Sequence, residues 1–214
     1  MRLYTSIGPN PRIVRMYAAE RGVALEEMWV DLVAGENRRE PFLTLNPAGQ
    51  LPVLEIAPGQ IVAESVAICE YLDETADTLS PRLVGSDPVT RARTRMWLRR
   101  IEERYSQPVT AAFRYGPGLA MFSPRLRCLP EAAEGMAALA RDGQAWLDAQ
   151  PTPGGFVASD VLTLADIALY CFMDFAINRA GLPLDPKHST LSGWFGRMDS
   201  RPSAQLTKPQ AKRA

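Results

Sequence analysis

Residues suited to binding an anion lie within the segment NPAGQLPVLEIAPGQIVAESVAICEYL, which spans positions 46–72. An acidic residue and a hydroxyl residue, Glu64-Ser65, stand at the expected start of a helix that runs to about Tyr71. Because the first backbone N–H groups of a helix have no partner within it, a hydroxyl here adds to an anion site. The alternative is that Ser65 only caps the helix and that Glu64 only faces the positive end of its dipole.

Two short strands and a turn must position this pair. Residues 51–56 and 61–63 have strand-forming composition, and Pro58-Gly59-Gln60 separates them. This pattern predicts a β-hairpin that leads directly into the helix beginning at Glu64-Ser65.

The whole-chain composition excludes several classes of function. The chain has 214 residues and a formal net charge of zero, so neither nucleic acid nor an anionic membrane is an expected partner. No signal peptide is visible at the N-terminus. The three cysteines, Cys69, Cys128 and Cys171, are widely spaced and odd in number, which favours a reducing cytoplasm. One histidine and no CxxC pair predict no metal site.

The motif NPAGQLPVL followed by ESVAICEYL resembles the glutathione-binding half of the soluble glutathione transferases, a thioredoxin-like domain. The resemblance runs from Leu3 to about Pro202 and ends in a W-x-x-R-x-x-x-R-P segment that begins at Trp194. It implies an α/β N-terminal thioredoxin-like domain, residues 1–75, followed by an all-α C-terminal helical domain, residues 88–214. Glutathione is then the expected co-substrate.

The order of elements agrees with that division. Residues 2–5 predict a first strand, and residues 12–21 a helix ended by Gly22. A second strand starts near Val23, and residues 31–39 form a loop or an irregular helix. Residues 74–88 read as a linker. Residues 89–114 predict a long helix bent near Pro108, and residues 131–150 a second long helix.

A sequence-level capping box opens the most apolar helix, at residues 164–177. Thr163 is followed three residues later by Asp166, so we assign both side chains to stability rather than catalysis. A last helix over residues 191–201 ends before Pro202.

The resemblance assigns roles to residues of the opening motif. It implies a cis peptide between Leu51 and Pro52. The backbone N–H and C=O of Val53 would pair with glutathione as with an added strand. Glu64 would accept hydrogen bonds from the γ-glutamyl ammonium, and the hydroxyl and N–H of Ser65 would bind its carboxylate.

Donors for the glycine end of glutathione are expected from Asn37 and Gln50. Both lie where family members place His, Lys or Gln. The position of Gln50 is fixed by the motif, since it stands just before the Leu51-Pro52 bond.

The position that would activate the thiol lacks the expected side chain. Gly8 stands where serine- and cysteine-type members carry their catalytic residue. We consider, in order of preference, Asn10, which matches the Asn of the T-P-N-G turn of bacterial nu-type members, then Ser6 and Tyr4. The alternatives are a turn residue for Asn10, a turn or cap residue for Ser6 and strand packing for Tyr4.

The electrophile pocket is expected between the two domains. Phe113, Arg114 and Tyr115, near the end of the long helix, are its candidate residues; core packing is the alternative for Phe113.

The leading hypothesis is a cytoplasmic, homodimeric glutathione transferase that conjugates glutathione to small hydrophobic electrophiles in detoxification. One alternative is glutathione-dependent reduction of disulfides or peroxides, suggested by the G-P-N-P turn. Another is a non-catalytic scaffold or ligand-binding protein, suggested by the missing side chain at Gly8.

Overall fold

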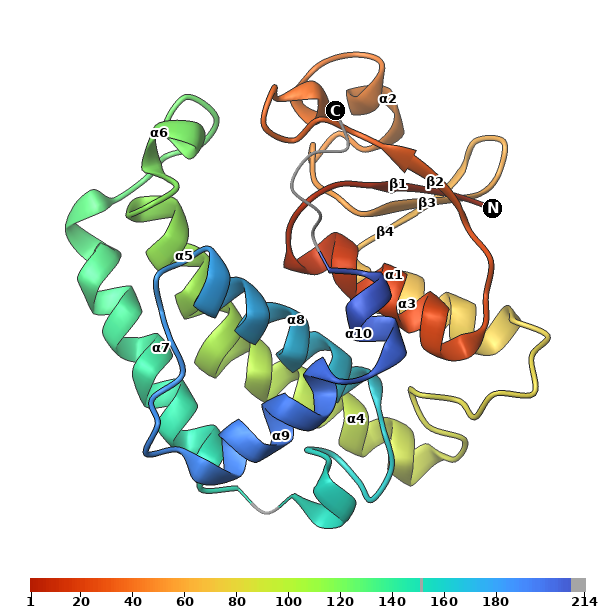
Figure 1. The fold of residues 1–214 in the computed structure, drawn as a ribbon. Coiled ribbons are helices and arrows are strands. Elements are labelled where there is room, and N and C mark those ends of the chain that lie inside the picture. The colour runs from red at the N-terminus through yellow and green to blue at the C-terminus, as the bar shows by residue number, and fades with distance from the viewer. Residues whose placement is uncertain (151, 209–214) are drawn as a thin grey trace. The chain divides into compact units, whose positions relative to one another are not determined.

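The computed structural model describes residues 1–150 and 152–208, which form two compact units. Unit 1 comprises residues 1–86 and the segment from Arg201 onward, and unit 2 comprises residues 87–200. The segment after Arg201, which the sequence-based division grouped with the helical domain, therefore packs with unit 1. Figure 1 shows the elements of both units.

Unit 1 is built on a four-stranded sheet. Its strands are β1 (Arg2–Thr5), β2 (Glu26–Trp29), β3 (Val53–Ala57) and β4 (Gln60–Ala63). They lie in the order β2-β1-β3-β4, with β1 parallel to β2 and the other two pairs antiparallel. The β3–β4 pair confirms the predicted hairpin, and the mixed sheet confirms the expected thioredoxin-like fold.

The helices of unit 1 are α1 (Pro9–Arg21), α2 (Phe42–Leu45), α3 (Ser65–Thr75) and α10 (Pro202–Leu206), with a 3-10 turn η1 (Glu36–Arg38). Helices α1 and α3 lie together on one side of the sheet, and α2 lies on the other (Figure 1). Helix α1 starts three residues earlier than predicted, because proline is well suited to the first position of a helix. Gly22 ends it in the left-handed conformation, as expected.

The core of unit 1 follows the alternation of side chains along β1 and β3. Leu3 and Leu54 are register partners and are completely buried. The neighbouring Tyr4 lies on the opposite face, where it packs against a cluster that contains Phe42 and Val53. Each face of the sheet therefore has its own apolar layer.

A buried carboxylate fixes α1 against α3. Asp73 of α3 accepts a hydrogen bond from the Tyr17 hydroxyl of α1 and lies 3.4 Å from the guanidinium of Arg21. The backbone N–H of Leu83 donates to the same oxygen at 3.0 Å. Burial and the Asp73 contact raise the pKa of Tyr17, so the hydroxyl remains a donor. This network sets the relative position of the two helices whose first residues form the candidate site.

Unit 2 is entirely helical. Its elements are α4 (Pro88–Ile101), η2 (Glu102–Ser106), α5 (Gln107–Tyr115), α6 (Leu119–Phe122), η3 (Pro130–Ala132), α7 (Ala133–Asp148), η4 (Pro153–Gly155), α8 (Leu164–Asn178) and α9 (Ser189–Asp199). Helix α8 is buried along most of its length and contacts both α4 and α9. Among the described residues, none of the helices has the length and apolarity needed to cross a membrane.

The predicted long helix is interrupted where proline was expected to bend it. Helices α4 and α5 are joined by the π-helical stretch η2, which ends two residues before Pro108. Proline has no N–H to donate to the carbonyl of Arg104, and its ring crowds that carbonyl, so the regular ladder cannot continue. Helix α7 packs closely against this stretch at Gly143. A Cβ added there would lie only 2.2 Å from the Arg104 oxygen.

The predicted capping box of α8 is present. Asp166 accepts hydrogen bonds from the backbone N–H and the hydroxyl of Thr163 at 3.0 and 2.8 Å. It also accepts from the N–H of Val157 at 2.9 Å and from the indole of Trp194 at 3.1 Å. These contacts tie the start of α8 to a preceding loop and to α9, which is a structural role.

Candidate functional site

Two helix N-termini of unit 1 converge on one point. Asn10, the second residue of α1, is exposed, whereas Ser65, the first residue of α3, is buried. The Ser65 hydroxyl donates to the Asn10 amide oxygen across 3.4 Å. An anionic or thiolate-bearing ligand placed here faces the positive ends of two helix dipoles.

The first turn of α1 offers its ligand an unusually small set of donors. Its first and third residues, Pro9 and Pro11, have no backbone N–H. The preceding Gly8 has no side chain and an extended, positive-φ backbone (φ 121°). Among the first three helical residues, only Asn10 therefore has a backbone N–H to donate. Its side-chain carboxamide is a second donor at the same position.

The start of α3, unlike that of α1, offers several backbone N–H donors. Glu64 occupies the N-cap position, and no side-chain hydrogen bond caps this helix. The hydroxyl of Ser65 therefore does not act as the simple cap that the sequence allowed. The N–H groups of Ser65, Val66 and Ala67 are the ones that a helix leaves unsatisfied at its start. This end of the site can accordingly hold a carboxylate through several backbone donors.

Glu64 adopts a backbone conformation that is costly for a residue with a side chain. Its φ is 71° and its ψ 125°, and it is the only non-glycine residue with a positive φ in the described part of the chain. Such conformations cost on the order of 1–3 kcal/mol and gather at ligand sites. Glu64 is exposed and directly precedes Ser65.

The loop that carries Gln50 is held from behind. The Asn37 amide donates to the Gly49 carbonyl at 2.6 Å, and the Asn46 amide donates to the Gln50 carbonyl at 2.9 Å. Asn37 is only 3% exposed, so the structure places it under the loop, whereas Gln50 is exposed. Gly49 has a φ of 60° and no room for a Cβ, which would meet the Asn37 carbonyl at 2.9 Å.

The Leu51-Pro52 peptide is cis, as the resemblance implies. Pro52 is buried, Leu51 is half-buried, and Val53 begins β3 directly afterwards. Val53 stands in register with Tyr4 of β1 and Ala63 of β4. The cis bond and the hairpin thus bring the loop to the same end of the sheet as Ser65.

The two other thiol-activating candidates have structural partners. Ser6 is 5% exposed, and its hydroxyl donates to the Val30 carbonyl at 2.7 Å. The Tyr4 hydroxyl donates to the Glu55 carboxylate at 3.5 Å, and its ring packs edge-on against Phe42 at 6.3 Å. Only Asn10 among the three candidates contacts Ser65.

The candidate electrophile residues differ in their surroundings within unit 2. Phe113 packs edge-to-face against Phe175 and Phe122, with ring centroids 4.9 and 6.0 Å away. The Arg114 guanidinium lies 5.4 Å over the Phe122 ring. Tyr115 is the last residue of α5 and is half-buried. Phe113 therefore belongs to an aromatic cluster, and Arg114 contacts that cluster through the Phe122 ring.

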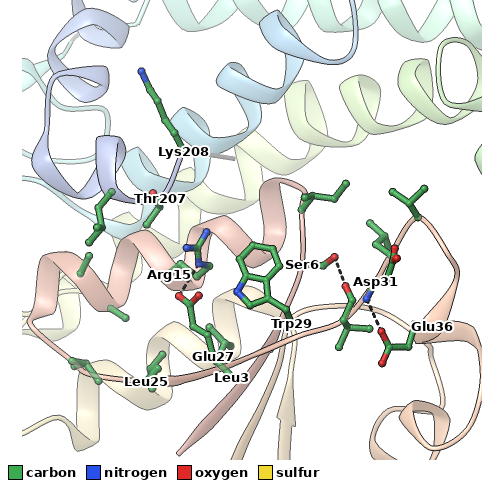
Figure 2. A pocket seen from close by; sticks show the side chains of 18 residues that line it. Leu3, Ser6, Arg15, Leu25, Glu27, Trp29, Asp31, Glu36, Thr207 and Lys208 are labelled. Carbon is green, nitrogen blue, oxygen red and sulfur yellow. Dashed lines mark hydrogen bonds and ion pairs between the residues drawn. The ribbon is translucent and has the colours of Figure 1, made fainter. Parts of the chain in front are cut away.

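A cavity of about 930 Å³ lies in unit 1 beside the β1–α1 turn (Figure 2). Of the candidate residues, only Ser6 lines it. Its most prominent wall is the indole of Trp29, which sequence reasoning missed. The available signal was a large aromatic residue at the end of a short strand that begins with two glutamates.

The fold and the site define a thioredoxin-like protein with an appended helical unit. Residues 7–75 match the family model for the N-terminal domain of glutathione S-transferase, and residues 126–202 match the model for its C-terminal domain. Glutathione S-transferase 2 of Saccharomyces cerevisiae is 30% identical over 206 residues, which cover 94% of this chain and 86% of that protein.

Solved structures are similar over almost the whole chain. The crystal structure of Gtt2 from Saccharomyces cerevisiae has a TM-score of 0.87 at 29% identity and covers 97% of this chain and 100% of that one. A Gtt2-class enzyme of Vibrio parahaemolyticus has a TM-score of 0.82 at 27% identity, with coverages of 97% and 96%. The chain belongs to the glutathione S-transferase family.

Proposed function

We propose that this protein transfers the thiolate of bound glutathione to small hydrophobic electrophiles, without a metal. The observation that carries the proposal is the contact between Asn10 and Ser65, which unites two helix N-termini beside the cis-Pro52 loop. One helix start supplies several donors for a carboxylate, and the other supplies a small donor set for a thiolate.

Each part of glutathione has a proposed partner. The Glu64 carboxylate accepts from the γ-glutamyl ammonium, and Ser65 and the N–H groups after it hold the adjacent carboxylate. The backbone of Val53, placed by Leu51 and Pro52, pairs with the cysteinyl residue. Gln50 donates to the glycine carboxylate, and Asn37 supports the loop from beneath.

Asn10 is the proposed donor to the thiolate. A free thiol with a pKa near 8.5 is only about 3% ionised at neutral pH. Lowering this pKa by about two units requires roughly 2.7 kcal/mol. One hydrogen bond to a charged group contributes about 1.5–3 kcal/mol, so the N–H and carboxamide of Asn10 suffice together. Since a less basic thiolate is a weaker nucleophile, positioning supplies much of the remaining acceleration.

The second substrate is proposed to meet Arg114 and Tyr115, with Phe113 behind them. A hydrophobic electrophile suits such a wall, because aromatic faces and a few polar groups are typical of small-molecule sites. The physiological role that follows is detoxification of reactive compounds. A cytoplasmic location is supported by the three widely spaced cysteines.

A homodimer is proposed on the basis of charge and exposure. The outward side of α4 carries Arg93 and Arg100 around the exposed Met96. The outward side of α3 carries Glu70 and Glu74. Contact between α3 of one protomer and α4 of its partner pairs unlike charges over apolar surface. Sedimentation velocity at low and high salt tests this, with salt-weakened dimers as the expected result.

The decisive experiment follows thiol ionisation by ultraviolet absorbance during a pH titration of glutathione with the protein. Wild type is expected to lower the thiol pKa clearly below that of free glutathione, and Asn10→Ala is expected to raise it again. Binding with an unshifted pKa would favour the non-catalytic scaffold. Parallel rates with an aryl halide and with a mixed disulfide separate conjugation from reduction, and conjugation is expected to be faster.

A further inference from the structure

The outer edge of β2 is an open edge of the sheet. Strand β2 is the first in the order β2-β1-β3-β4, so it has a neighbouring strand only on the β1 side. The backbone N–H groups of Glu26 and Val30 donate to carbonyls of residues 1 and 5, at 3.2 and 2.9 Å. Because backbone groups alternate in direction along a strand, the N–H and C=O groups of Glu27 and Trp29 point away from β1.

These outward backbone groups are available to another chain. Within residues 1–150 and 152–208, the backbone of Glu27 and of Trp29 has no hydrogen-bond partner on this side. The next outward N–H, that of Asp31, already donates to the Glu36 carboxylate at 2.7 Å, so the open edge ends there. All four residues of β2 are exposed, which is true of no other strand in the sheet. An extended segment that adds here gains main-chain hydrogen bonds.

Large apolar side chains are exposed beside the same edge. Met28 and Trp29 of β2 are 38% and 40% exposed, and Val33 in the following loop is 58% exposed. Ile7 and Leu206, which line the cavity beside β2 together with Trp29 and Val33, are also exposed. Figure 2 shows the Trp29 indole extending from β2 into that cavity. Because exposed apolar patches mark interaction sites, this patch favours a partner with apolar side chains of its own.

Negative charge predominates along this edge. Asp31 and Glu36 form no ion pair with the described residues, since each carboxylate accepts from a backbone N–H. Arg2 contacts Glu26 but is shared with Glu55. A second copy of β2 would bring further glutamates to the edge, so it is a poor partner, whereas a basic segment is a good one. In β2 and the cavity lining, the carboxylates outnumber the cations: Glu26, Glu27, Asp31 and Glu36 against Arg15 and Lys208.

We propose that the outer edge of β2 binds an extended, basic segment of a partner protein, which adds to the sheet as a fifth strand. The Glu27 and Trp29 side chains lie on the α1 side of the sheet, where Arg15 contacts both. Alternate apolar side chains of the segment pack on that side, against Trp29 and into the cavity. The lysines or arginines between them lie on the other side, with Glu26. None of the proposed glutathione-binding residues belongs to β2 or to the cavity lining, so the inference does not rest on the proposed function.

A synthetic peptide tests the chemistry of the partner. The probe is a fluorescein-labelled peptide that alternates lysine with valine or phenylalanine, of sequence KVKFKVK, and its binding is followed by fluorescence anisotropy. The same peptide with glutamate in place of lysine is expected to bind at least about tenfold more weakly, because it meets like charges at the edge. High salt is expected to narrow that difference. Equal binding of the two peptides at low salt would overturn the inference.

Methylation of the peptide's backbone nitrogens tests strand addition. In an added strand, alternate N–H groups face β2 and the others face solvent. N-methylation of either the apolar residues or the lysines, but not of both sets, is therefore expected to weaken binding by at least about tenfold. The sensitive set is the apolar one if the added strand is antiparallel to β2, because directly opposite residues then share a face of the sheet. Loss of binding with both sets, or with neither, would overturn the inference.

A proline on β2 tests the edge from the protein side. Glu27→Pro removes an outward N–H and leaves the bonds to β1 in place, since an edge strand tolerates proline where its nitrogen faces solvent. Glu27→Ala is the matched control, because it loses the same carboxylate but keeps the N–H. Glu27→Pro is expected to bind KVKFKVK at least about tenfold more weakly than Glu27→Ala, while both bind glutathione like wild type. Equal peptide binding by the two folded variants would overturn the inference, and the methylated peptides decide if Glu27→Pro does not fold. Peptide binding without glutathione conjugation would count against the proposed function alone.

Discussion

The hydroxyl of Ser65 lies 3.4 Å from the amide oxygen of Asn10, although the two residues are 55 positions apart. Each stands in the first turn of its helix. Because the Asn10 oxygen accepts from Ser65, its amide nitrogen is directed elsewhere and can donate to a ligand. The contact therefore couples the residue proposed to bind a carboxylate to the residue proposed to bind a thiolate.

Ser65→Ala is expected to weaken glutathione binding with little effect on stability. The variant loses a hydrogen bond to a charged group, worth about 1.5–3 kcal/mol, so KM for glutathione should rise by roughly tenfold to a hundredfold. The hydroxyl caps no helix, so the thermal midpoint should change little. Thr75→Ala removes a hydroxyl from the other end of α3 and should leave KM unchanged. Steady-state kinetics and thermal unfolding separate the two effects.

Ser6→Ala is expected to lower the stability of the protein without changing the thiol pKa of bound glutathione. The Val30 carbonyl loses its 2.7 Å donor in a buried place, which costs about 1–3 kcal/mol of unfolding free energy. The thiol pKa of bound glutathione should stay at the wild-type value, unlike that of Asn10→Ala. Urea unfolding and the ultraviolet titration give the two numbers. A thiol pKa raised as much by Ser6→Ala as by Asn10→Ala would reassign the thiolate donor.

Glu64→Gly is expected to stabilise the protein while weakening glutathione binding. Glycine adopts a positive φ without the clash that costs other residues on the order of 1–3 kcal/mol, although its flexible unfolded state offsets part of the gain. Glu64→Ala should lose affinity without becoming more stable. Glu74→Gly, within the same helix, should destabilise by about 1 kcal/mol. Denaturant unfolding of the three variants tests the sign in each case.

Glu20→Gln is expected to remove stability that depends on pH. Burial opposes ionisation of Glu20, but hydrogen bonds from Arg201 and Ser203 outweigh it and lower its pKa below the ordinary 4.5. The stability contributed by the carboxylate is therefore present above that value and is lost as the pH falls through the folded-state pKa. The gap between wild type and variant should be constant down to about pH 5 and should narrow below it.

The matched control for Glu20 is an exposed ion pair. Glu134 pairs with Arg141, and its side chain is 83% exposed. Since surface pairs contribute little, Glu134→Gln should leave thermal stability nearly unchanged at every pH. A Glu20 variant that tracks this control would mean that the Arg201 contacts are not stabilising.

Gly143→Ala and Gly135→Ala are expected to have opposite effects within one helix. A Cβ on Gly143 would approach the Arg104 carbonyl to 2.2 Å, so α7 must shift, at a cost of about 1–3 kcal/mol. A Cβ on Gly135 meets nothing within 4 Å, and alanine should stabilise the helix by roughly 0.5–1 kcal/mol. Chemical unfolding gives the change in the free energy of unfolding for each variant. Changes of the same sign would refute the close packing at Gly143.

Local signals predicted the local structure well. The hairpin, the Gly22 helix end and the capping box of Thr163 and Asp166 all depend on residues a few positions apart. The cis bond before Pro52 was expected from the family resemblance instead. The irregularity at Pro108 was also predictable, since the missing N–H is a property of that residue alone. The form of the irregularity is a π-helical stretch rather than a simple bend. This form depends on helix packing and could not be predicted from the sequence.

Contacts between distant segments could not be read from spacing. Asn37 has the residue type of a ligand donor, but the fold turns it beneath Gly49. Ser6 and Tyr4 have suitable hydroxyls, but their partners, Val30 and Glu55, belong to other parts of the sheet. Trp29 gives no motif, because the cavity that it lines is created by α1 and by residues near position 207.

The return of the chain to unit 1 has a consequence for its synthesis. The buried Arg12 of α1 donates a hydrogen bond to the Ala204 carbonyl at 3.1 Å. The Glu20 carboxylate accepts one from the Arg201 guanidinium at 2.7 Å. A nascent chain that has emerged to residue 86 contains all four strands of the sheet but neither of these partners. Domains generally fold as they leave the ribosome, N-terminal first. Here unit 2 possesses its whole sequence at residue 200, before translation has supplied the last helix of unit 1.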